Sequence, residues 1–179
     1  MVVAEKKAVK KIPEGYTTVT PWIISPDSAR VISFMANAFD AEEIHGSRTL
    51  SPTGKIIHVE VKIGDAIVML FDAAKTWPST PAFIRLFVDN CEKSYQKALN
   101  AGARMVTKPT MLSIGDKVAR VADPFGNIWW VQERVEDISG MNPDDVVIRS
   151  KEPAAVKAMK YVEESLFTEL AKRSHPSSL

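Results

Sequence analysis

The chain has 179 residues, of which 45% are hydrophobic and 25% are charged, as in an ordinary globular protein of one domain or two small fused halves. Its formal net charge of +1, with acidic and basic residues interleaved, argues against nucleic acid as a partner. No apolar run is long enough to span a membrane, so we expect no membrane association. The single cysteine, Cys91, excludes an intramolecular disulfide and favours a reducing, cytoplasmic location.

The N-terminal part divides into a polar segment, a strand and a helix. Residues 1–15 carry several lysines and no long apolar run, and we expect them to be flexible. Residues 16–24 are mostly β-branched or aromatic and predict a strand, with an irregularity at Pro21. Asp27 then predicts the N-cap of a helix whose apolar residues recur at helical spacing.

Three further strands are expected before residue 77. Residues 40–50 predict a mixed strand, and residues 55–63 alternate between an apolar face and a face with His58 and Glu60. A turn at Gly64 and Asp65 leads into a nearly continuous apolar strand over residues 66–71. Two prolines in residues 77–81 then indicate a linker.

The same order of elements repeats in the second half of the chain. A strand over residues 83–88 precedes a helix that Asn90 caps and that ends at Gly102. Three more strands are expected over residues 103–113, 117–122 and 127–134. A strand, a helix and three strands thus occur twice with a period of roughly sixty residues, which indicates an internal duplication.

The pattern ends after Asp137. Residues 138–152 predict a linker, and residues 153–173 predict a C-terminal helix that begins at a proline. Its apolar residues form one stripe, Val156, Met159, Val162, Leu166 and Leu170. We expect this stripe to pack on its own domain or on a second subunit.

The motifs and their order resemble those of the vicinal-oxygen-chelate superfamily, which includes glyoxalases, bleomycin resistance proteins and dioxygenases. The resemblance covers residues 16–137 and depends on the Asp89-Asn90 helix entry, the helix exit over residues 98–103 and the DPFGN sequence over residues 123–127. The GKIIHVEV hairpin over residues 54–61 is similar to the PhnB-like branch. The resemblance implies an α+β fold of two βαβββ modules, about 16–76 and 81–137, that form a ligand cleft.

Metal-dependent members of this superfamily place a His, Glu or Gln on the first and last strand of each module. The matching positions here are Thr20, Phe83, Trp130 and either Met69 or Val68. None offers imidazole, thiolate or carboxylate, the donors that a zinc, iron or manganese site requires. We therefore expect no metal and no cofactor, and the metal-dependent isomerase, dioxygenase and thiol-transferase activities are put in doubt.

The resemblance and the strand alternation together predict a ligand-binding set. Its members face the expected cleft and are Thr20, Trp22, Phe83, Arg85 and Trp130. The two tryptophans serve either a pocket or the core. Arg85 either binds an anionic ligand or forms a structural ion pair with an acid such as Glu60 or Asp72.

His58 and Glu60 are candidate catalytic residues because residues two apart on a strand share a face. They could act as an acid-base pair, form a structural pair, or begin a relocated metal site with His45. Cys91 is expected near the start of the second helix, as a buried thiol or as an activated thiolate.

Three functions remain open from the sequence. The first is a metal-free small-molecule-binding protein of unknown ligand, and the second is an enzyme (a lyase, isomerase or dioxygenase-like protein) that uses the His58–Glu60 pair or a relocated metal. The third is an interaction module that uses the C-terminal helix. We also predict a homodimer, because the superfamily shares clefts between modules or subunits and the C-terminal stripe adds apolar surface.

Overall fold

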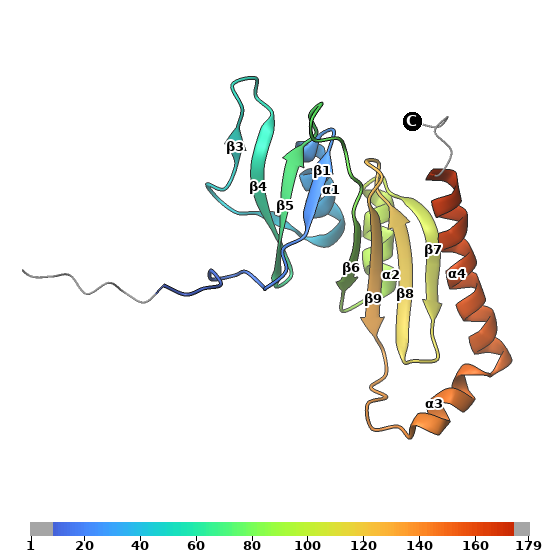
Figure 1. The fold of residues 1–179 in the computed structure, drawn as a ribbon. Helices are drawn as coiled ribbons and strands as arrows, with labels where there is room; N and C mark the ends of the chain where they lie inside the picture. The colour runs from blue at the N-terminus through green and yellow to red at the C-terminus, as the bar shows by residue number, and fades with distance from the viewer. Residues whose placement is uncertain (1–8, 174–179) are drawn as a thin grey trace, which may run out of the picture.

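The computed structural model describes residues 9–173 (Figure 1). The predicted flexible segment therefore lies partly outside the described residues, and its residues 9–15 form no helix or strand. Within residues 9–173 no helix is both long and apolar enough to cross a membrane.

Two modules of the same topology make up the larger part of the chain. The elements of the first are β1 (Trp22–Ser25), α1 (Ser28–Phe39), β2 (Glu42–Glu43), β3 (Thr49–Leu50), β4 (Ile56–Ile63) and β5 (Ala66–Asp72). Those of the second are β6 (Phe83–Phe87), α2 (Cys91–Asn100), β7 (Arg104–Met111), β8 (Asp116–Ala122) and β9 (Ile128–Arg134). The strand orders are β1-β5-β4-β2, with β3 also paired to β4, and β6-β9-β8-β7. In each sheet the first strand runs parallel to the last, so the predicted α+β fold of two βαβββ modules is confirmed.

Local signals explain both helices of the modules. The side chain of Asp27 accepts a hydrogen bond from the Arg30 backbone N–H at 3.1 Å, and Asn90 accepts one from Lys93 N–H at 2.8 Å. Gly102 follows α2 with a φ of 99°, a left-handed conformation that favours glycine. These three residues thus set the helix limits that the sequence predicts.

The core lies between the sheets and the two helices. Figure 1 shows the sheets side by side, with α1 behind the first and α2 behind the second. Alternate strand residues such as Ile23, Leu70 and Trp129 are fully buried in one cluster with α1 and α2. The other face of each sheet points away from these helices, and we call it the open face of that sheet.

The first strand is shorter than predicted. It begins at Trp22 rather than Tyr16, because Pro21 has no N–H to continue the ladder and only its carbonyl accepts a hydrogen bond, from Met69 N–H at 3.0 Å. The mixed strand expected over residues 40–50 is two strands of two residues each, β2 and β3, separated by a turn at Gly46.

A short helix, α3 (Pro143–Ser150), occupies the stretch expected to be a linker. Asn142 caps it by accepting a hydrogen bond from Asp144 N–H at 3.0 Å, and Pro143 takes the first helical position. The acidic pair Asp144 and Asp145 then lies in the first turn, where the helix dipole favours it. These residues carried a helix-start signal that the sequence analysis missed.

The C-terminal helix, α4 (Pro153–Arg173), is confirmed and packs against β7 on the open face of the second sheet (Figure 1). Val162 is buried there with Leu112, Val118 and part of Trp130. The predicted apolar stripe is only partly correct, because Val156, Met159 and Leu170 are exposed. The docked side of α4 is largely polar instead.

Candidate functional site

Three aromatic rings gather on the open face of the first sheet. The pairing of β1 with β5 puts Trp22 opposite Met69 and Ile24 opposite Phe71, and a small loop closed by two Ala74–Trp77 backbone hydrogen bonds adds Trp77. The Trp22 ring lies 4.9 Å from Phe71 and 6.2 Å from Trp77. Trp22 is 51% exposed and Trp77 is 45% exposed, so this aromatic cluster has an uncovered surface.

His58 and Glu60 lie beside this cluster as the strand alternation predicted. His58 Nε2 is 3.2 Å from Glu60 Oε1, and the His58 ring meets Phe71 edge-on at 5.8 Å. A hydrogen bond to Glu60, burial and the charge of Glu60 raise the pKa of Tyr16 to about 12, so this phenol stays neutral at physiological pH. The arrangement offers a histidine that a carboxylate orients, next to aromatic surface.

The structure shows where the four positions that the resemblance matched to metal ligands lie. Phe83 and Trp130 do come together, with ring centroids 6.3 Å apart. In the first module Met69 reaches the open face whereas Val68 is buried in the core, and Thr20 precedes β1. Within residues 9–173 no group of three or more His, Cys, Asp or Glu side chains could hold a metal ion, so His45 does not complete a site with His58 and Glu60.

Arg85 is on the open face of the second sheet, between the exposed rings of Phe83 and Phe87. Its Cζ lies 4.7 Å from the ring centroid of Trp130, a cation–π contact. Among residues 9–173 Arg85 forms no ion pair, so neither of the two acids considered as its partner takes that role. Glu60 pairs with His58, and the carboxylate of Asp72 accepts hydrogen bonds from Ser28 and Ile56 N–H.

Arg120 is a site residue that the sequence analysis missed. It is 2% exposed, its Cζ is 3.8 Å from the Trp130 ring, and its Nη1 donates to Thr107 Oγ1 at 3.2 Å and to the Val162 carbonyl of α4 at 2.6 Å. Burial, and then the charge of Arg85, lower its pKa to about 10. An arginine between apolar residues on both sides, within residues 118–122, was the signal that could have identified it.

Several buried polar atoms of Trp130 and of residues on β8 and β9 lack hydrogen-bond partners among the described residues. In the described part of the chain Arg120 Nε, Trp130 Nε1 and Gln132 Oε1 make no hydrogen bond. Buried donors and acceptors are almost always satisfied, so such a group indicates a missing partner or strain.

Cys91 is buried, and burial together with the charges of Glu92 and Glu133 raises the pKa of its thiol to about 12, which disfavours the reactive thiolate.

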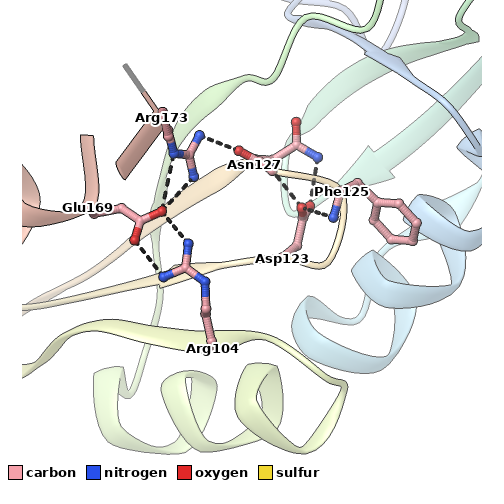
Figure 2. Close-up of polar contacts among 7 residues, drawn as sticks. Arg104, Asp123, Phe125, Asn127, Glu169 and Arg173 are labelled. Carbon is pink, nitrogen blue, oxygen red and sulfur yellow. Dashed lines mark hydrogen bonds and ion pairs between the residues drawn. The ribbon is translucent and has the colours of Figure 1, made fainter. Parts of the chain in front are cut away.

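The DPFGN sequence has a structural role in the turn between β8 and β9 (Figure 2). The Asp123 carboxylate accepts four hydrogen bonds at 2.7 to 3.0 Å, from Phe125 N–H, Asn127 N–H, Asn127 Nδ2 and Trp129 Nε1. Asn127 Oδ1 in turn accepts from Ala82 N–H at 2.9 Å, just before β6. The motif thus fixes where β6 and β9 lie, and with them Phe83 and Trp130.

The end of α4 is tied to the same turn (Figure 2). Glu169, which is 2% exposed, accepts from Arg104 and from Arg173, and Arg173 Nη1 donates to the Gly126 carbonyl at 2.5 Å. Burial opposes ionisation of Glu169, but the hydrogen bonds from Arg104 and Arg173 outweigh it and hold the pKa of this carboxyl below its usual value. These contacts fix the helix on the open face.

Comparison with known proteins assigns the family. Residues 16–131 match the Glyoxalase/Bleomycin resistance protein/Dioxygenase superfamily model, and the chain belongs to this superfamily. It is 34% identical over 132 residues to the uncharacterized protein Mb0911c of Mycobacterium bovis, covering 68% of this chain and 86% of that protein. The uncharacterized Mycobacterium tuberculosis protein Rv0887c is also 34% identical, covering 68% of this chain and 76% of that protein.

Solved structures support the same fold. TioX from Micromonospora sp. ML1 matches with a TM-score of 0.56 at 18% identity, covering 66% of this chain and 98% of that one. A glyoxalase/bleomycin resistance protein/dioxygenase family enzyme from Burkholderia phytofirmans matches with a TM-score of 0.52 at 18% identity, covering 63% and 94%. The family match ends before α3 and α4 begin.

Proposed function

We propose that this chain is a metal-free, small-molecule-binding protein of its superfamily, related to the PhnB-like branch by its GKIIHVEV hairpin over residues 54–61. The observation that carries the proposal is the uncovered aromatic cluster of Trp22, Phe71 and Trp77 on the open face of the first sheet. Soluble proteins rarely expose contiguous apolar surface without a binding role. Aromatic side chains with a few polar groups are the usual lining of a ligand site.

The donor chemistry supports binding without a metal. The resemblance matches Trp130 and Phe83 to positions where metal-dependent members have ligands, and their ring centroids lie 6.3 Å apart. Aromatic rings at these positions supply contact area to an organic ligand, whereas they supply no lone pair to zinc or iron.

We further propose a cytoplasmic homodimer. A second copy of the chain would cover the exposed rings of Phe83 and Phe87 and the aromatic cluster. It would also close the site between two subunits. Sedimentation equilibrium at micromolar concentration is expected to show a dimer, and a monomer alone would contradict this part.

The test of the binding function uses an apolar fluorescent probe, 1-anilinonaphthalene-8-sulfonate, with the full chain. We expect saturable binding that is unchanged by EDTA and weakened severalfold in Trp77→Ala, because the cluster loses a ring. Phe167→Ala on the exposed side of α4 is the matched control and should bind as the parent does. Loss of binding on chelation, or stoichiometric metal in the purified protein, would refute the metal-free function.

A second candidate is acid-base catalysis by His58, favoured by its 3.2 Å contact with Glu60 beside the aromatic cluster. The carboxylate would fix the imidazole tautomer and the orientation of the ring. A turnover that disappears in His58→Ala while probe binding persists would establish this enzyme function over simple binding.

A further inference from the structure

Two arginines flank Trp130 on the open face of the second sheet without a counterion. Arg85 on β6 and Arg120 on β8 are both paired in register with Trp130 on β9, so the three side chains form a row across the sheet. Their guanidinium carbons lie 4.7 Å and 3.8 Å from the same ring. Neither arginine forms an ion pair with a carboxylate among residues 9–173, and Arg120 donates to two neutral oxygens.

The acids closest in the sheet and on α4 are already paired. Asp116 accepts from Gln132 Nε2 at 2.5 Å and pairs with Arg134 Nε at 3.3 Å. Glu169 pairs with Arg104 and Arg173. The protein therefore holds two neighbouring positive charges, one of them buried, and their mutual repulsion costs free energy until an anion is added.

Unused donors converge on the same row. Arg120 Nε and Trp130 Nε1 are buried and make no hydrogen bond within the described residues, while Arg85 is exposed and accessible. Phe83 and Phe87, on the same face as Arg85, are 54% and 65% exposed. The row thus combines cationic N–H donors with apolar surface alongside them.

We propose that Arg85, Arg120 and Trp130 bind the carboxylate of an organic acid whose apolar body lies on Phe83 and Phe87. The inference rests on the proposed binding function and adds to it a site for an anionic group on the second sheet, whereas the aromatic cluster lies on the first. A carboxylate accepts two N–H groups from an arginine in one plane, and hydrogen bonds between ions are about twice as strong as neutral ones. The Val162 carbonyl of α4 holds Arg120 beneath the helix, so α4 positions one half of the site.

The test compares two probes of equal shape, 2-naphthoate and the neutral 2-naphthamide, by isothermal titration calorimetry with the full chain at pH 7.5. We expect 2-naphthoate to bind about tenfold more tightly, the value of one charge-assisted hydrogen bond. Arg85→Gln should abolish this preference, so that the two probes bind the variant with equal affinity. Added salt should reduce the preference as well, because Arg85 is exposed.

The matched control is Arg30→Gln. Arg30 is also exposed and also lies over an aromatic ring, with its Cζ 5.3 Å from the Phe125 centroid, but it has no second arginine beside it. This variant should keep the full preference for 2-naphthoate. Trp130→Phe retains a ring, removes the N–H donor, and should lower the preference about threefold.

The outcomes separate the two proposals. If both probes bind equally to the parent, or if Arg85→Gln keeps the preference, the carboxylate site is wrong while the binding function stands. If neither probe binds while the fluorescent probe still binds at the aromatic cluster, the carboxylate site is wrong and the binding function stands; if none of the three probes binds, both are wrong. If Arg85→Gln instead weakens the dimer in sedimentation equilibrium and the parent shows no preference, the anion is a carboxylate of a second copy, and the small-molecule site is overturned.

Discussion

The open faces of the two sheets differ in what covers them. On the first sheet the rings of Trp22, Phe71 and Trp77 pack against one another, with His58 edge-on to Phe71, and Trp22 and Trp77 stay exposed. On the second sheet α4 lies across the β7 side and buries Val118 and Arg120. The two modules thus share one topology but differ in that α4 docks on the open face of the second.

The contacts that hold α4 on the second sheet are largely polar, whereas the contacts of the core are apolar. Val162 is the buried apolar contact, whereas Tyr161 accepts a hydrogen bond from Lys108 N–H at 2.9 Å and Ser165 bonds to Thr107 at 2.7 Å. Hydrogen bonds and ion pairs specify one orientation of a helix more strictly than apolar contact does. This explains how α4 can sit at the edge of the open face of the second sheet and leave Arg85 exposed.

The largest expected effect is from removal of α4. A chain that ends at Ser150 exposes Val118 and leaves Arg120 without the Val162 carbonyl, so we expect the free energy of unfolding to fall by about 3 kcal/mol. Urea denaturation followed by circular dichroism measures this. If the truncated chain is as stable as the parent and dimerises equally, α4 contributes nothing to the second face.

A single substitution in the α4 contact should give a smaller loss. Glu169→Gln leaves Arg104 and Arg173 facing an uncharged group in a buried position, and we expect a cost of about 1–3 kcal/mol. Glu164→Gln, in the exposed pair with Lys160, is the matched control and should change stability by less than about 0.5 kcal/mol. Equal effects of the two substitutions would contradict a special role for Glu169.

The same carboxyl predicts a pH dependence. The pKa of Glu169 is lower in the folded protein than in the unfolded chain, so its contribution is complete above the unfolded pKa and is lost as the pH falls through the folded value. The stability difference between the parent and Glu169→Gln should therefore shrink as the pH falls from about 5 towards 3. A difference independent of pH over that range would show that packing, not charge, is lost.

Much of the difference between the two open faces, but not all of it, could be predicted from the sequence. Strand alternation predicted that Trp22 and Arg85 lie away from the core and that His58 and Glu60 share a face, because a period of two is a local property of the chain. It could not show that α4 docks on the second face through Tyr161, Ser165 and Glu169, since that depends on partners some sixty residues away in sequence. Thr20 was placed in a strand that Pro21 in fact delays.

Arg120 and Arg85 show most clearly what could not be predicted from the sequence. The sequence offered Glu60 or Asp72 as a partner for Arg85, and both acids turned out to be used within the first module. That Arg120 lies on the other side of Trp130 follows from the β8–β9 register, which the sequence alone does not give. The two neighbouring positive charges of Arg85 and Arg120 therefore could not be predicted before the strand register was known.

The smallest loss of stability is expected from substitutions on the open face of the first sheet. Trp77→Ala removes an exposed ring from the aromatic cluster, and His58→Ala removes a half-buried imidazole, so each should change the free energy of unfolding by about 1 kcal/mol or less. Trp130→Ala, on the second face, should cost about 3 kcal/mol, because its ring packs against Phe83, Arg85 and Arg120. Thermal unfolding of the three variants under one condition gives the ranking. A Trp77→Ala loss as large as that of Trp130→Ala would mean that the first open face is part of the protein's structural core, and its aromatic cluster would then no longer support a ligand site.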